Sequence, residues 1–159
     1  MGASQIDRFG NQNIACVGDP RKPKVQLLGM RGAPGNTINH TTSYWIPAHT
    51  RRVFVPKVDV VTGVGYDRAA SLPERSRRFH EIRRVVTNLA VLDFATADHS
   101  MRIVSVHPGV KLADVIEQTG FPLQFTEPHA ITREPSPEEL ELLRTAIDPK
   151  GLGAKEVPA

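Results

Sequence analysis

Short apolar runs, each closed by glycine, proline or charged residues, recur along the chain and predict strands. Near the start, "QIDRF" and "QNIACV" flank Gly10 and Asn11, which is typical of a hairpin whose turn needs a positive φ. Four further segments have the length and the aliphatic content of strands. They are Lys24–Gly29, Arg51–Val55, a pair of strands within Arg83–Phe94, and Ser100–Gly109 with its Pro-Gly break.

Helical spacing is clearest near the end of the chain. Ser136 to Glu139 form a capping box with proline at the first helical position, and this predicts a helix. Its apolar stripe consists of Leu140, Leu143 and Ile147. A shorter helix is predicted over Leu112–Gln118, where apolar residues share one face.

Before these helices the pattern is weaker. Asn36 is predicted to cap a short helix that runs to Tyr44 or Trp45 and stops before Pro47. The segment Ala69–Arg78 is expected to be an exposed loop.

Several of the predicted strands are continuous apolar runs, which favours burial on both faces of a sheet. The predicted fold class is therefore α/β, with an open mixed sheet and flanking helices. Residues 1–150 are expected to form a single domain, and residues 151–159 a loose tail. Val25–Leu28 and Val53–Val55 have few helices to cover them, so we expect a partner subunit or preceding sequence to complete the layer.

Composition limits the possible functions. The chain has 159 residues, a net charge of +3 and one cysteine, Cys16, which lies in an apolar stretch and is expected to be buried. No run approaches a membrane span, and neither a signal peptide nor a disulfide is indicated, so a cytoplasmic protein is expected. The basic cluster Glu74–Arg84 is interpreted as a solvated surface, with an anionic small ligand second and nucleic acid a distant third.

The residues that carry chemistry follow no common catalytic motif. The six histidines lack metal-ligand spacing, so no metal site is predicted. One segment is unusual: Gly29–Asn39, "GMRGAPGNTIN", contains three glycines, a proline and two asparagines. It is either a plain turn between a strand and a helix or a backbone cradle for ligand oxygens, and its spacing alone leaves both open.

Three ordered motifs resemble the B subunits of class I CoA-transferases. "GASQIDRFGNQN" (residues 2–13) resembles the signature G-A-x-Q-x-D-x-x-G-N-x-N, and "VQLLGMRGAPGN" resembles the glycine-rich loop of that family. "RRVVTNLAVLDF" followed by "MRIVSVHPGVKLADVIEQTGF" resembles its C-terminal pattern. The resemblance implies an open α/β fold and an A subunit as partner, in a heterodimer or heterotetramer whose active site lies at the subunit interface.

Within this family the chain is most similar to a hydrolytic branch that opens a steroid ring carried on a CoA thioester. "VDVVTGVGYD", "DHSMRIVSVHPGV" and "IDPKGL" carry this closer likeness. It implies hydrolytic ring opening of a cyclic β-keto acyl-CoA, with coenzyme A as part of the substrate and no permanently bound cofactor. A true acyl-CoA:carboxylate CoA-transferase and a non-catalytic scaffolding or truncated subunit are the alternatives.

The resemblance also implies roles for individual residues. The loop residues Gly29, Gly32 and Ala33 would face the thioester, and their N–H groups would stabilise an oxyanion. Arg31 stands where the transferases have glycine, which suggests a pairing with a substrate carboxylate. Hydrogen bonds to the substrate are expected from Asn36, His40 and Tyr44. The essential glutamate is expected on the A partner or upstream of Met1, and Asp7 and Asn11–Asn13 are expected to be structural.

Overall fold

A computed structural model of the chain describes residues 1–27 and 29–156. Its centre is a five-stranded sheet in the order β5-β6-β7-β8-β9. The outer pairs β5–β6 and β8–β9 are parallel, and the inner pairs are antiparallel, so the predicted mixed α/β sheet is confirmed. The strands span β5 Thr41–Ile46, β6 Glu81–Thr87, β7 Ala90–Asp93, β8 Arg102–Val106 and β9 Ala130–Ile131.

Two small antiparallel pairs precede this sheet. The predicted hairpin is confirmed: β1 (Gln5–Ile6) pairs with β2 (Gln12–Asn13), and Gly10 in the turn has φ +82°. β3 (Cys16–Val17) pairs with β4 (Val25–Gln26), which lies within the predicted strand Lys24–Gly29. Leu28 of that strand lies outside the described residues.

The strand predicted over Arg51–Val55 was wrong. This segment is a turn, and its one ladder contact is an isolated parallel bridge between Phe54 and Ile6. Ile6 donates its N–H to the Val53 carbonyl and accepts the N–H of Val55. Both of these main-chain hydrogen bonds are therefore made by a single residue of the hairpin. The β propensity of this segment therefore yields only an isolated bridge, because the strand beside it, β1, is only two residues long.

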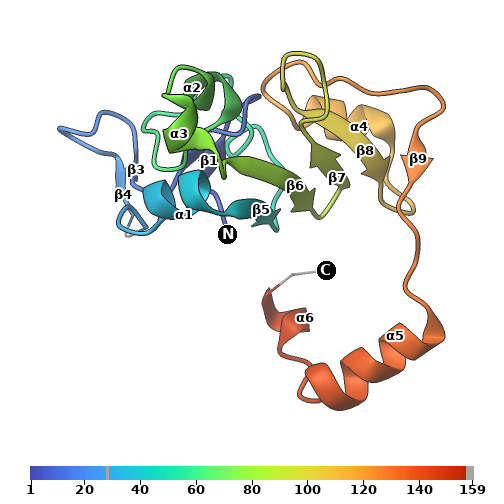
Figure 1. Cartoon of the computed structure of the whole chain (residues 1–159). Coiled ribbons are helices and arrows are strands. Elements are labelled where there is room, and N and C mark those ends of the chain that lie inside the picture. The colour runs from blue at the N-terminus through green and yellow to red at the C-terminus, as the bar shows by residue number, and fades with distance from the viewer. Residues whose placement is uncertain (28, 157–159) are drawn as a thin grey trace.

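The helices of the chain are short (Figure 1). The expected exposed loop Ala69–Arg78 instead contains the end of α2, where Ala69 is buried, and the whole of α3, which is exposed. The capping box of the last long helix is confirmed, as is the helix after the Pro-Gly turn. The bounds are α1 Ala33–Asn39, α2 Tyr66–Ala70, α3 Glu74–Arg77, α4 Leu112–Glu117, α5 Pro137–Leu142, the π-helical turn η1 Leu143–Ile147, and α6 Gly153–Glu156.

The helix predicted from Asn36 to Tyr44 or Trp45 was wrong in both bounds. α1 begins at Ala33, with Gly32 as N-cap, and ends at Asn39. The residues after it, "TTSYWI", form β5 with strictly alternating exposure. Because this segment is rich in β-branched and aromatic residues, pairing with β6 outweighs helix continuation. The alternation leaves one face of β5 exposed.

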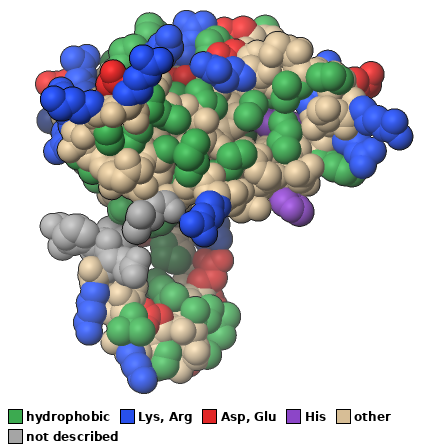
Figure 2. Space-filling view, turned by 90° about the vertical axis from the view of Figure 1, so that its left-hand side faces the viewer, with side chains coloured by type: hydrophobic (Ala, Val, Ile, Leu, Met, Phe, Trp, Pro, Cys, Tyr) green, Lys and Arg blue, Asp and Glu red, His purple; other side chains and the backbone are tan. Residues whose placement is uncertain are grey.

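The C-terminal segment stands apart from the sheet (Figure 1). Its predicted apolar stripe is largely uncovered, with Leu143 45% and Ile147 67% exposed. A helical turn, α6, lies within the predicted tail. Figure 2 shows the same segment below the rest of the molecule. It also shows Lys and Arg side chains along the upper rim, separated from one another by acidic, hydrophobic and other residues. No helix in the described part of the chain is long and apolar enough to cross a membrane.

The core between the sheet and α4 contains a buried histidine. His49 is 2% exposed and stacks on Phe54 with ring centroids 3.8 Å apart. Its Nε2 lies 2.9 Å from the hydroxyl of Thr119, which donates to a main-chain carbonyl and so accepts from the ring. Its Nδ1 faces Thr87 Oγ1, which already accepts two main-chain N–H groups. These contacts suit a neutral ring, and burial lowers the pKa of His49 to about 4.

We therefore predict that His49 makes the fold sensitive to acid. The pKa of this histidine is lower in the folded chain than in the unfolded one, so the unfolded state binds more protons between pH 6.5 and 4. The free energy of unfolding should fall by roughly 3 kcal/mol on this account as the pH drops through that range. Urea unfolding at stepped pH measures it.

The contribution of His49 is isolated by two variants. His49→Gln keeps hydrogen-bonding atoms but does not titrate, so the slope between pH 6.5 and 4 should become shallower. His40→Gln replaces an exposed histidine and should leave the slope unchanged. An identical slope in His49→Gln and the parent chain would contradict the prediction.

Candidate functional site

The signature motif near the N-terminus forms a buried hydrogen-bonded scaffold. Asn11 donates its side-chain N–H groups to the carboxylates of Asp7 and Asp67 and accepts the N–H of Gly65 at 2.8 Å. Gly65 is required here, because a Cβ would lie 2.5 Å from the Asn11 nitrogen. Burial raises the pKa of Asp7 more than the hydrogen bonds from Asn11 lower it. These contacts support the structural interpretation of the motif.

A further residue of the motif, Asn13, binds the next segment of the chain. Asn13 donates to the Gln5 side chain and to the Cys16 carbonyl, both at 2.7 Å. The side-chain oxygen of Asn13 accepts the N–H of Ala15 at 3.0 Å, so this one side-chain amide fixes the path from β2 into β3. Cys16 is buried, as predicted, and is a free thiol.

The same scaffold anchors α1, which follows the glycine-rich loop. Thr37 lies on the inner face of α1 and is fully buried. Its hydroxyl donates to the Ala33 carbonyl at 2.9 Å and accepts the N–H of Val64 at 3.1 Å. The helix is thereby joined to the segment that Asn11 holds, so the loop before it is fixed at both ends.

Gly29 begins this loop and packs against the scaffold. Its N–H donates to the Ile14 carbonyl at 3.1 Å, so this group is not free to bind a ligand oxygen. A Cβ at Gly29 would lie 2.7 Å from Ile14 Cγ1 and 2.9 Å from its Cβ. The glycine is therefore needed for close packing, a reason that differs from the predicted oxyanion role.

The next residues in the loop are Arg31, Gly32 and Ala33. Among the described residues, no acceptor is found for the N–H groups of Gly32 and Ala33. Gly32 is exposed, whereas the Ala33 side chain is 2% exposed and holds the start of α1 against the body. Arg31 is exposed in the turn before α1, and no ion pair is formed by it within the described part of the chain.

Two of the predicted substrate-binding residues meet in one hollow. Asn36 and His40 lie on the exposed side of α1 and at its C-terminal end, four residues apart. They line a space of about 370 Å³, here called the His40 hollow. Its other lining residues are Met1, Thr41, Thr42 and Ser43.

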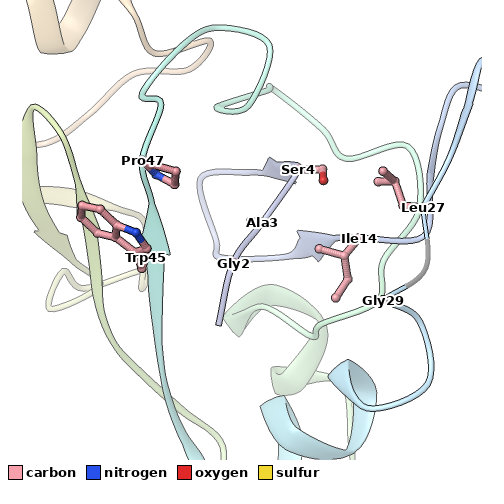
Figure 3. Close-up of a pocket in the computed structure, with 8 residues that line it drawn as sticks. All are labelled: Gly2, Ala3, Ser4, Ile14, Leu27, Gly29, Trp45 and Pro47. Carbon is pink, nitrogen blue, oxygen red and sulfur yellow. The ribbon is translucent and has the colours of Figure 1, made fainter. Parts of the chain in front are cut away.

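A second hollow lies beside it along the edge of β5. It has a volume of about 430 Å³ and is here called the Trp45 hollow (Figure 3). Met1 separates the two, since it donates to the Ser43 carbonyl and accepts from Trp45 N–H. The Trp45 hollow is lined by Gly2, Ala3, Ser4, Ile14, Leu27, Gly29, Trp45 and Pro47.

Tyr44 lies in neither hollow. It points to the inner face of β5, is 1% exposed, and its hydroxyl has no hydrogen-bond partner among the described residues. Burial raises the pKa of its phenol above the ordinary value. The neighbouring Trp45 points outward and is 42% exposed. The strand register therefore places Trp45 at the surface, whereas Tyr44 was the residue predicted to bind the substrate.

The Trp45 hollow was not predicted from the sequence. The available signal was the alternation in "TTSYWI", which places every second residue on one face once the segment is assigned as a strand. Ile14, Leu27 and Gly2 meet Trp45 only through the tertiary fold, and no local pattern indicates that meeting. In the part of the chain described by the structure, no group of three or more His, Cys, Asp or Glu side chains could hold a metal ion.

Comparison with known proteins connects this geometry to one family. The model of the coenzyme A transferase family matches residues 1–118. The cholesterol ring-cleaving hydrolase IpdB subunit of Rhodococcus jostii (strain RHA1) is 51% identical over 158 residues, which are 99% of this chain and 62% of that protein. The chain therefore spans less than two thirds of the length of this relative.

Solved structures show the same likeness. The crystal structure of Rhodococcus jostii RHA1 IpdAB matches with a TM-score of 0.92 and 50% identity, covering 99% of this chain and 63% of that one. Glutaconate coenzyme A-transferase from Acidaminococcus fermentans matches with a TM-score of 0.85 and 31% identity, covering 95% and 58%.

The packing of Gly29 generates a prediction. Gly29→Ala should lower the free energy of unfolding by about 1–3 kcal/mol, because the new Cβ would overlap the branched carbons of Ile14. Gly35→Ala is the matched control: no atom lies within 4 Å of its new Cβ, and alanine favours the helix, so stability should rise by up to about 1 kcal/mol. Denaturant unfolding measures both, and equal effects of the two substitutions would refute the packing role.

Proposed function

This chain belongs to the coenzyme A transferase family, and on that basis we propose that it is the β subunit of a heteromeric enzyme that hydrolytically opens a cyclic β-keto acyl-CoA in steroid breakdown. The observation that carries the proposal is the 51% identity to a cholesterol ring-cleaving hydrolase subunit across 99% of this chain. The partner is an A subunit, and the site of action is the cytoplasm.

In the proposed reaction, water adds to the ring ketone and the bond between that carbon and the α-carbon of the thioester breaks. The former ketone becomes a carboxylate, and the electron pair moves to the thioester as an enolate, which then takes up a proton. The N–H groups of Gly32 and Ala33, for which the described residues provide no acceptor, suit the negative oxygen of this enolate. Coenzyme A is part of the substrate, with no permanently bound cofactor, and the essential glutamate is assigned to the partner subunit.

Arg31 is proposed to bind a carboxylate of the substrate outside the reacting ring. Its guanidinium is exposed on the loop that carries Gly32, and a planar fork of donors suits a carboxylate. Asn36 and His40 in the His40 hollow are proposed to bind polar atoms of the same substrate. Tyr44 is buried behind β5, so its contribution to this set is to hold the strand in place.

The alternative is an acyl-CoA:carboxylate CoA-transferase, favoured by the likeness to glutaconate coenzyme A-transferase. The two reactions separate when the complex of this chain and its partner subunit is given a cyclic β-keto acyl-CoA in ¹⁸O-labelled water. Hydrolytic ring opening places one ¹⁸O in the new carboxylate and leaves the thioester intact. Transfer of CoA to an added free acid, without ring opening, would overturn the hydrolase proposal. Inactivity of a well-folded complex towards both substrates would favour a non-catalytic subunit.

The role of Arg31 is tested by substitution. Arg31→Ala should lower kcat/KM by about 10- to 100-fold for a substrate with a free carboxylate arm, since a charged hydrogen bond contributes about 1.5–3 kcal/mol. The same substitution should change little when the arm is a methyl ester. Arg75→Ala, an exposed arginine on α3, is the matched control. An equal loss with both substrates would exclude a carboxylate contact.

A further inference from the structure

The Trp45 hollow has an uncharged and mainly apolar lining. Among its eight lining residues, Ser4 alone has a polar side-chain group other than the indole N–H of Trp45, and none is ionisable. The hollow has Trp45 and Pro47 on one side and Ile14 and Leu27 on the other (Figure 3). Between them lie Gly2 and Ala3, and these small residues leave the space unfilled. The phosphates of a nucleotide need cationic side chains, so this hollow does not suit the nucleotide end of coenzyme A.

The main chain around the hollow has few donors to offer. The N–H of Trp45 on the free edge of β5 is already bound to the Met1 carbonyl. Two residues further on, Pro47 has no N–H, so edge pairing cannot continue into the hollow. Ser4 donates its N–H to Asn13, and Leu27 donates its N–H to Ala15. The hollow therefore offers few hydrogen-bond donors to a polar ligand, and its lining is better suited to bind a hydrocarbon surface.

The indole of Trp45 is partly exposed to solvent, and its burial by a ligand would be favourable. An indole is one of the largest apolar surfaces a side chain offers, and 42% of Trp45 is accessible to solvent. The space of about 430 Å³ in front of it falls within the range of small-molecule sites. Gly29 lies on the wall of this hollow, and it begins the loop that carries Gly32 and Arg31.

From these observations we propose that the Trp45 hollow binds the fused alicyclic rings of the acyl group, packed against the indole. This inference rests on the proposed function, since that function supplies a cyclic acyl-CoA as ligand. The rings would lie beside the glycine-rich loop, and the His40 hollow on the other side of Met1 would be left for polar atoms of the same substrate.

Tryptophan fluorescence gives a direct readout, because Trp45 is the only tryptophan of the chain. The complex of this chain and its partner subunit is titrated with hydrindane carboxylate, a fused two-ring acid, and separately with free coenzyme A. The same titration of Trp45→Phe provides the background from the partner. Hydrindane carboxylate should change the emission of Trp45, and free coenzyme A should not.

Calorimetry then compares affinities for hydrindane carboxylate among variants. Gly2→Leu fills the hollow, and it has room to do so, since a Cβ at Gly2 meets only the Trp45 carbonyl oxygen at 3.9 Å. Gly2→Leu and Trp45→Ala should each weaken binding by about tenfold or more. Phe125→Ala removes an aromatic side chain that is also 42% exposed but lies outside the hollow, and it should leave the affinity unchanged.

Two results would overturn the inference. A change in Trp45 emission with free coenzyme A but not with hydrindane carboxylate would assign the hollow to the pantetheine chain. An unchanged affinity in both Gly2→Leu and Trp45→Ala would place the rings elsewhere. Ring-opening activity is measured on the same preparation: activity without ring binding here rejects this inference alone, and binding at Trp45 without ring opening supports the hollow while rejecting the proposed function.

Discussion

The side-chain amide of Asn11 is the contact on which the arrangement of the site depends. One amide donates to two carboxylates, Asp7 and Asp67, and accepts the N–H of Gly65, so it joins the hairpin turn to a segment more than fifty residues away. A buried carboxylate is costly unless hydrogen-bonded, and the raised pKa of Asp7 reflects that cost. The amide is buried together with Asp7, and loss of it would leave several polar groups without partners at once.

This contact matters for the site because irregular segments build it. The chain from Val58 to Gly65 forms no strand, yet it supports both the hairpin and α1. Its main chain pairs with β2 only through an isolated antiparallel bridge between Gln12 and Gly63. Side chains add to this bridge: Thr62 donates to the Gln12 carbonyl, and Thr37 accepts the N–H of Val64. The loop from Gly29 to Ala33 is thus held between fixed points, which keeps the N–H groups of Gly32 and Ala33 in one position.

Much of the fold could be predicted from the sequence where the determinants are local. The turn at Gly10 and the capping box at Ser136 depend on residues within a few positions, and both were predicted with the correct structure. The errors lie where tertiary partners decide. Thr41–Ile46 became a strand because β6 runs beside it, and Arg51–Val55 did not because only Ile6 is available to it.

The candidate site shows the same division at the level of single residues. The glycine-rich loop was identified from its composition, but the reason for its first glycine was not: Gly29 is needed because Ile14 lies against it. Likewise, Tyr44 and Trp45 are adjacent in the sequence, and a helical assignment could not tell which of them faces solvent. The strand register decides, because a shift of one residue exchanges the two faces. A prediction of site residues in this chain therefore depends first on the assignment of β5, and the indole reaches its hollow only because that strand pairs with β6 in the observed register.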